Sequence, residues 1–192
     1  MNPKKYVYTF GNGEAEGSAE MKNLLGGKGA NLAEMNRIGV PVPPGFTITT
    51  EASIDYYQVG KEDTIKRLTD QVTDGVHAVE KMLGKQYGDP SNPLLLSARS
   101  GARVSMPGMM DTVLNMGLND DIVEGFAKMT GNEWAAWDSY RRFVQMYGDV
   151  VLDMKPASKE DHDPFEDIIE SLKRERNVTL DTELTVDDLK EL

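Results

Sequence analysis

The stretch that decides the fold runs from Leu25 to Ala30 and reads Leu-Gly-Gly-Lys-Gly-Ala. Apolar residues follow at helical spacing over residues 32–38, and Gly39 ends the pattern where a C-cap glycine belongs. The glycines therefore open a helix. Glycine lets backbone N–H groups approach an anion closely, and Lys28 adds a point charge beside them. The stretch indicates either a phosphate-binding turn or a plain glycine turn with a solvated lysine.

This motif differs from the Walker A loop of nucleotide-binding proteins. The leading glycine of that loop is missing, and Gly29 stands where Ser or Thr should follow the lysine. A phosphate site here would therefore need support from other residues.

Short strands and one long helix surround the glycine-rich stretch. Residues 13–19 are small and polar and predict a loop, and three prolines make residues 40–45 an extended connection. Apolar residues at threes and fours predict a helix over residues 65–83 that ends at Gly84. The predicted strands are Tyr6–Phe10, Phe46–Thr49 and a buried apolar run at Leu94–Leu96.

The chain beyond Asn119 is predicted to be helical throughout. Asn119 caps one helix, Asp163 followed by proline caps another, and Thr185 caps a third of barely two turns. A helix that short is marginal without packing, and we expect the chain to lack that packing, as in a sequence cut short. Between them, a stripe at positions 137, 140, 144, 147 and 151 predicts the buried face of a helix.

Composition excludes several classes of protein. The 192 residues carry 39% apolar residues and 18 glycines, which is ordinary for a globular protein. No apolar run is long enough for a membrane helix, and the absence of cysteine excludes a disulfide scaffold and a thiol nucleophile. The net charge of -11 argues against general nucleic-acid binding. We therefore expect a cytoplasmic protein whose anion site, if it has one, is local.

A second candidate anion site follows the strand at residues 94–96. Ser97–Arg103 places two arginines and two serines at a strand end, where guanidinium groups can hold phosphate bidentately. The alternative is a loop whose arginines cap helix carbonyls. The methionines of residues 105–112 surround a Pro107-Gly108 turn and could cover a flat ligand or dock the loop on the helical half.

Arg142 and the charged residues around His162 each have a simple structural interpretation. Arg142 lies about 200° around its helix from Tyr140, which from the helical pattern alone favours a solvated side chain. Asp161-His162-Asp163 resembles a metal cluster, but Asp163 already serves as a helix cap, so a structural role is favoured. Neither His77 nor His162 has a nucleophile arranged beside it.

Taken in order, these motifs resemble the N-terminus of the pyruvate, phosphate dikinase family. The related phosphoenolpyruvate synthases share the glycine–lysine and arginine themes but lack the methionine-rich run at residues 106–112. The resemblance spans nearly the whole chain. The matching segments are Met21–Met35, Val42–Phe46, Ser97–Arg103, Pro107–Thr112 and Asp138–Phe143.

The resemblance implies an α+β chain, the first part of an ATP-grasp nucleotide-binding domain. Residues 1–115 would form an α/β segment with phosphate-binding loops, and residues 116–192 a helical subdomain truncated at its C-terminus. Lys28 and Arg99 match ATP-phosphate contacts, Gly108 matches a position beside the nucleotide, and Arg142 matches a catalytic arginine of the phosphoryl-transfer site.

The resemblance also implies partners outside this chain. ATP and phosphate would react here, while a phosphohistidine domain and a pyruvate-binding domain belong to the same parent, a homodimer. The acidic pair and glutamine that hold Mg²⁺ with ATP are expected beyond residue 192, so no metal ligands are expected in this segment. The alternatives are a stand-alone nucleotide-binding or regulatory module without catalysis, and a dikinase that acts on a glucan.

Overall fold

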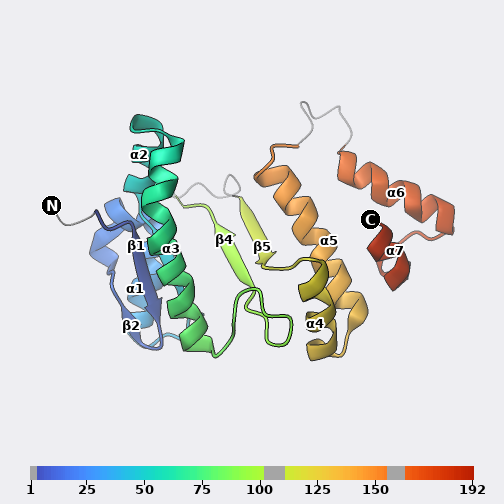
Figure 1. Ribbon diagram of the computed structural model, residues 1–192, viewed down its shortest axis with the longest axis horizontal. Coiled ribbons are helices and arrows are strands. Elements are labelled where there is room, and N and C mark those ends of the chain that lie inside the picture. Colours follow the sequence, from blue (N-terminus) through green and yellow to red (C-terminus); the bar gives the residue numbers. More distant parts are fainter. Residues whose placement is uncertain (1–3, 102–110, 155–162) are drawn as a thin grey trace. The chain divides into compact units, whose positions relative to one another are not determined.

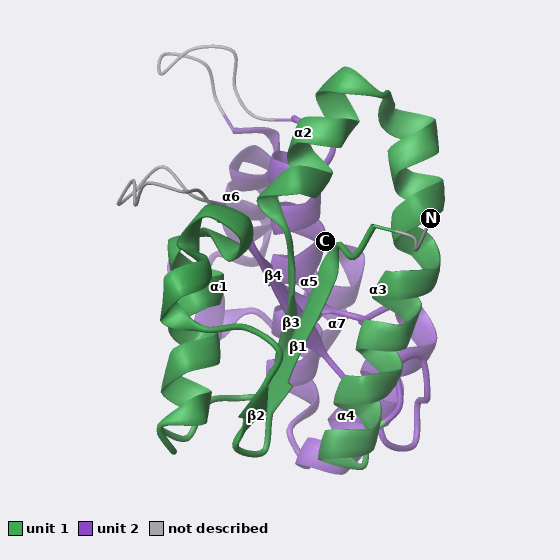
Figure 2. Ribbon diagram, turned by 90° about the vertical axis from the view of Figure 1, so that its left-hand side faces the viewer, with its two compact units in different colours: residues 1–85, 100–110 green, residues 86–99, 111–192 purple. Residues whose placement is uncertain are grey.

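The computed structural model describes residues 4–101, 111–154 and 163–192 (Figure 1). Packing divides the chain into two compact units (Figure 2). Unit 1 comprises residues 1–85 and 100–110, and unit 2 comprises residues 86–99 and 111–192. Both mix helices and strands, which confirms the α+β class. The predicted boundary after residue 115 falls inside a strand of unit 2 and stays a prediction about the domains of the parent.

Unit 1 is a small antiparallel sheet packed against helices. The strand order is β2-β1-β3, and Val7 of β1 pairs with Ile48 of β3. The strands are β1 (Val7–Gly11), β2 (Glu14–Ala15) and β3 (Gly45–Ile48). The helices are η1 (Ala19–Met21), α1 (Lys22–Arg37), α2 (Thr50–Gln58) and α3 (Lys61–Leu83).

Helices α1 and α3 cover opposite faces of this sheet, as Figure 2 shows. A Cβ on Gly75 of α3 would lie 2.9 Å from the ring of Phe46, and one on Gly29 of α1 would lie 2.6 Å from Thr47. Phe46 and Thr47 are consecutive in β3, and consecutive strand residues point to opposite faces. The glycine-rich stretch therefore belongs to the helix on the Thr47 face.

The two predicted strands of unit 1 are confirmed within one residue, and both predicted helices are present but begin earlier than predicted, at Lys22 and Lys61. The long helix ends at Gly84, which adopts the left-handed conformation with φ 63°. Two predictions were incomplete: the predicted loop at residues 13–19 contains β2, and α2 was not predicted.

Unit 2 combines a two-stranded antiparallel ribbon with helices. The ribbon pairs β4 (Leu96–Arg99) with β5 (Thr112–Met116). The predicted strand at residues 94–96 is shifted toward the C-terminus: β4 begins at Leu96, and Leu94 is buried but precedes the strand. The helices are α4 (Asp120–Thr130), α5 (Glu133–Val150), α6 (Pro164–Arg176), η2 (Asp181–Glu183) and α7 (Val186–Glu191).

The predicted caps of unit 2 are confirmed. The Asn119 side chain accepts hydrogen bonds from the backbone N–H groups of Asp121 and Ile122. The Asp163 carboxylate accepts from Phe165 and Glu166, and the Thr185 hydroxyl accepts from Asp188. Each cap satisfies N–H groups that a helix start leaves without an intrahelical partner.

The expectation that α7 lacks packing is wrong. Leu189 of α7 is buried in a cluster with Leu172 and Leu184, and Trp134 packs against that cluster. The indole Nε1 of Trp134 also donates to the Leu184 carbonyl at 2.7 Å. The packing comes from residues far away in the sequence, which a local pattern does not reveal.

The predicted buried stripe of α5 is also wrong in its C-terminal half. Val144, Tyr147 and Val151 are 43%, 40% and 53% exposed. Gly148 is buried instead, because the Phe165 ring of α6 lies where a Cβ of Gly148 would stand, 2.3 Å from it. Helix α6 thus packs on the glycine side of α5.

In the described ranges, no helix is long and apolar enough to cross a membrane.

Candidate functional site

The glycine-rich stretch opens a helical segment, as predicted, but a shorter helical segment precedes it, and α1 joins the two across a break. The helix begins at Lys22, and Gly26 breaks its geometry with φ 70° and ψ 169°. This backbone conformation is essentially restricted to glycine. Lys28 therefore lies in the first turn after a break in the helix.

Gly29 serves packing. Its Cα is buried against β3, and an added Cβ would lie 2.6 Å from Cγ2 and 2.8 Å from Oγ1 of Thr47. Backbone conformation at Gly26 and close packing at Gly29 thus account for two of the three glycines. Lys28 stays the predicted phosphate contact of this stretch.

The Lys28 side chain is exposed and tied to the second predicted stretch. Within unit 1, its ammonium Nζ donates to the Ser100 carbonyl at 3.0 Å. Ser100 follows Arg99 directly in the chain. An ammonium group has three N–H donors, so this contact orients Lys28 and leaves donors for an anion. Lys28 therefore contacts the part of the second predicted stretch that belongs to unit 1.

Arg99 ends β4, where it pairs with Thr112 of β5, and its side chain is exposed. Within the described parts of the chain, no hydrogen-bond or ion-pair partner is assigned to its guanidinium. This group has five N–H donors in a planar fork that matches a phosphate. Gly108 and Arg103 lie outside the described residues, as does the methionine-rich turn around Gly108.

Arg142 lies on α5 and is exposed, in agreement with its position off the predicted stripe. Its side chain is 60% exposed, and its Nε donates to Oδ2 of Asp138 at 2.8 Å. The neighbouring Arg141 is buried and donates through Nε and Nη2 to Oδ1 of the same carboxylate, at 3.2 and 2.7 Å. Sequence reasoning missed Asp138, although acid–base spacings of three and four residues on a helix signal such pairs.

The candidate residues fall in both units. Lys28 belongs to unit 1, and Arg99 and Arg142 belong to unit 2. Within unit 2, β5 pairs with β4 and also packs against α5. Arg99 and Arg142 therefore lie on two elements that share β5 as a neighbour.

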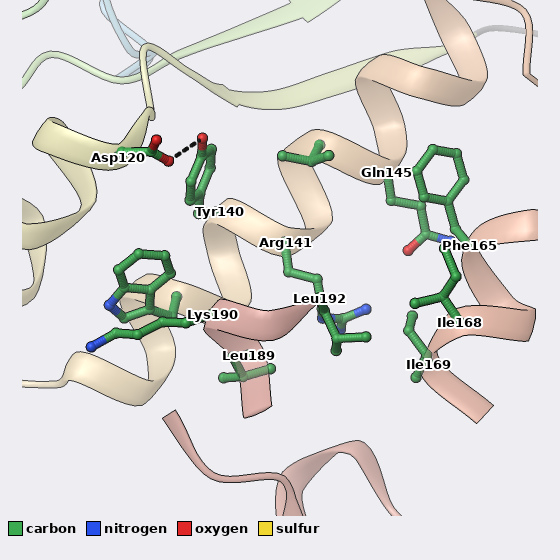
Figure 3. A pocket seen from close by; sticks show the side chains of 12 residues that line it. Asp120, Tyr140, Arg141, Gln145, Phe165, Ile168, Ile169, Leu189, Lys190 and Leu192 are labelled. Atoms are coloured by element: carbon green, nitrogen blue, oxygen red, sulfur yellow. Dashed lines mark hydrogen bonds between the residues drawn. The ribbon is translucent and has the colours of Figure 1, made fainter. Parts of the chain in front are cut away.

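A hollow of about 220 Å³ in unit 2 is not a phosphate site (Figure 3). It lies between α5, α6 and α7, and apolar side chains such as Phe165, Ile168 and Leu192 line it. Its polar groups already have protein partners: the Tyr140 hydroxyl donates to Asp120 at 2.9 Å, and Lys190 donates to Glu133 at 3.0 Å. Burial and the Asp120 carboxylate raise the pKa of Tyr140. None of the three candidate cations lines this hollow.

The described residues contain no group of three or more acidic or histidine side chains that could hold a metal ion. Asp161 and His162, the other two members of the cluster next to Asp163, lie outside those residues.

Comparison with known proteins shows which family this chain resembles. Residues 22–74, which include the glycine-rich stretch, match the family described as "Pyruvate phosphate dikinase, AMP/ATP-binding domain". The chain is 56% identical over 188 residues to the pyruvate, phosphate dikinase of Clostridium symbiosum, covering 98% of this chain and 20% of the relative. The chain is homologous to the N-terminal region of pyruvate, phosphate dikinases.

Two further relatives support this relationship. The chloroplastic pyruvate, phosphate dikinase of Mesembryanthemum crystallinum is 54% identical over 188 residues, covering 98% of this chain and 19% of that protein. The pyruvate, phosphate dikinase of Rhizobium meliloti (strain 1021) is 54% identical over 181 residues, covering 94% of this chain and 19% of that protein. The resemblance seen in the sequence motifs is confirmed. The chain spans about a fifth of the length of these dikinases.

Proposed function

We propose that this chain is the N-terminal ATP-binding segment of a pyruvate, phosphate dikinase. The parent would convert ATP, phosphate and pyruvate to AMP, pyrophosphate and phosphoenolpyruvate through a phosphohistidine on another of its domains. High identity over nearly the whole chain supports this proposal. An ATP-grasp fold, Mg²⁺ bound with ATP by residues beyond 192, a homodimeric parent and a cytoplasmic location are parts of the same proposal.

Within that reaction, the cations of this chain act on phosphate oxygens. Lys28 and Arg99 contact the phosphates of ATP, Gly108 lies beside the nucleotide, and Arg142 contacts the phosphoryl group in transfer. Phosphoryl transfer needs fixed positive charge around the oxygens and little covalent chemistry from the protein. The observation that carries the proposal is the Lys28–Ser100 contact, which orients one cation beside the backbone that follows the exposed Arg99.

The proposal predicts that Arg99→Ala in the full-length parent impairs one half-reaction selectively. The rate of histidine phosphorylation by ATP and phosphate should fall by about 10²- to 10³-fold, because a charged donor to the reacting phosphates is lost. Exchange between pyruvate and phosphoenolpyruvate should stay within about twofold, since that chemistry lies in other domains. Rapid-quench and isotope-exchange assays measure the two rates separately.

The matched control is Arg174→Ala, which removes an exposed arginine of α6 in the same unit. This control should leave both half-reactions unchanged. Equal losses in both half-reactions for Arg99→Ala would contradict the proposed contact and indicate a folding role for Arg99.

A further inference from the structure

We propose that Asp138 is a positioning residue, which holds the guanidinium of Arg142 through Nε and so aims its terminal nitrogens at the transferred phosphoryl group. This inference rests on the proposed function of Arg142. The carboxylate divides its two oxygens between two arginines: Oδ1 accepts from Arg141 and Oδ2 accepts from Arg142. The two arginines that share this carboxylate differ in burial and in the nitrogens that they use to contact it.

Arg141 anchors the acid. Its side chain is 8% exposed, and it donates to Asp138 through both Nε and Nη2. Its Nη2 also lies 3.5 Å from Oδ2 of Asp181, whose other oxygen accepts from Lys173 at 3.1 Å. A buried carboxylate held by a buried guanidinium has little freedom to rotate. Asp138 is therefore a fixed acceptor on the surface of α5.

Arg142 keeps the terminal nitrogens of its guanidinium available to a ligand. Only its Nε contacts Asp138, and the described residues place no partner on its two terminal nitrogens. The side chain is 60% exposed, whereas the Asp138 side chain is 11% exposed. A guanidinium held at Nε keeps its plane fixed and offers both terminal nitrogens as a bidentate fork for phosphate oxygens.

Positioning of this kind acts on rate more than on ground-state binding. A free arginine loses side-chain rotamer freedom on being fixed, and a pre-oriented one has already lost much of it. Misplacement by about 1 Å at a reacting centre can lower a rate by about 100-fold. Arg141 also offsets the negative charge of Asp138, so the carboxylate does not cancel the charge that Arg142 offers to phosphate.

The test is a double-mutant cycle between Asp138→Asn and Arg142→Ala in the full-length parent. Asp138→Asn should lower kcat of the ATP/phosphate half-reaction by about 10- to 100-fold and change KM for ATP by less than about threefold. It should leave pyruvate–phosphoenolpyruvate exchange unchanged. In the Arg142→Ala background, Asp138→Asn should cause no further loss, because nothing remains to be positioned.

The matched control is Glu133→Gln on α5, the helix of Asp138. It breaks the exposed ion pair with Lys190 of α7 and should leave the rates unchanged. Asp138→Asn alone could fail to fold because the buried Arg141 loses its partner. In that case Arg141→Met removes the buried cation first, and the double-mutant cycle between Asp138→Asn and Arg142→Ala is measured in the Arg141→Met variant.

The outcomes separate this inference from the proposed function. An Arg142→Ala variant with a normal ATP/phosphate half-reaction would overturn both. A strong effect of Arg142→Ala together with no effect of Asp138→Asn would overturn the positioning role alone. Losses that multiply in the double variant, or that affect both half-reactions equally, would show that Asp138 serves folding only.

Discussion

Single acidic residues carry much of the local order in this chain, and Asp188 shows how. Its carboxylate accepts from the Thr185 hydroxyl at 2.6 Å, the Thr185 backbone N–H at 2.8 Å and Nε of Arg176 at 2.5 Å. The Thr185 hydroxyl, with the Arg176 guanidinium, lowers the pKa of Asp188 from 3.8 to about 2. The charged form is therefore favoured by folding.

This shift predicts an acid-sensitive contribution to stability. The folded-state pKa of Asp188 lies below its unfolded value, so the contribution is fully present above about pH 4 and is lost as the pH falls toward 2. Thermal unfolding measured from pH 6 to pH 2 should show a steeper loss of Tm for the unmodified chain than for Asp188→Asn. Asp187→Asn, at the exposed neighbouring position, should follow the unmodified chain. Parallel curves for Asp188→Asn and the unmodified chain would contradict the assignment.

The residue scale is also where sequence reasoning was most and least successful. Asn119, Asp163 and Thr185 were predicted as caps because a cap depends on a few adjacent residues. The exposure of Arg142 was predicted from helical periodicity. The division of the Asp138 carboxylate between two arginines was not predicted. It depends on which of the two adjacent arginines becomes buried when α5 packs against other elements.

At the scale of elements, the break in α1 is a specific requirement for glycine. Gly26→Ala should lower the free energy of unfolding by about 1–3 kcal/mol, since φ 70° with ψ 169° is strained for any residue with a Cβ. Urea denaturation measures this change. Gly101→Ala is the control, because Gly101 is exposed and an added Cβ there meets no atom within 4 Å. An unchanged or higher stability of Gly26→Ala would mean that the helix is not broken at this residue.

The bounds of an element were predicted correctly where the signals lie within the segment. The buried face or the packing of an element was predicted wrongly where it depends on residues distant in the sequence. The long helix α3 ends at Gly84 as predicted, because a C-cap glycine and apolar spacing both lie within the segment. The buried face of α5 was wrong, since Phe165 of α6 packs against Gly148. The packing of α7 was missed because Trp134 and Leu172 reach it from other helices.

At the scale of the whole molecule, the net charge of -11 means that positive charge for phosphate is a local arrangement. Composition and periodicity alone left a plain glycine turn as the leading interpretation of the Lys28 stretch. The ordered set of motifs indicated the family, and the comparisons confirmed it. The roles of Lys28, Arg99 and Arg142 stay predictions because contacts to a nucleotide depend on groups that the described residues do not include.

The most direct test of the central claim is the thermal unfolding of this 192-residue chain with and without millimolar Mg-ATP. The chain would supply phosphate-contacting cations without the Mg²⁺ ligands, so its affinity should be weak. A ligand at its dissociation constant stabilises by about 0.4 kcal/mol, which raises Tm by roughly 1–2 °C for a chain of this size. Combining Lys28→Met with Arg99→Ala should abolish that shift. A shift above about 5 °C, or formation of AMP and pyrophosphate from ATP, phosphate and pyruvate, would contradict the account.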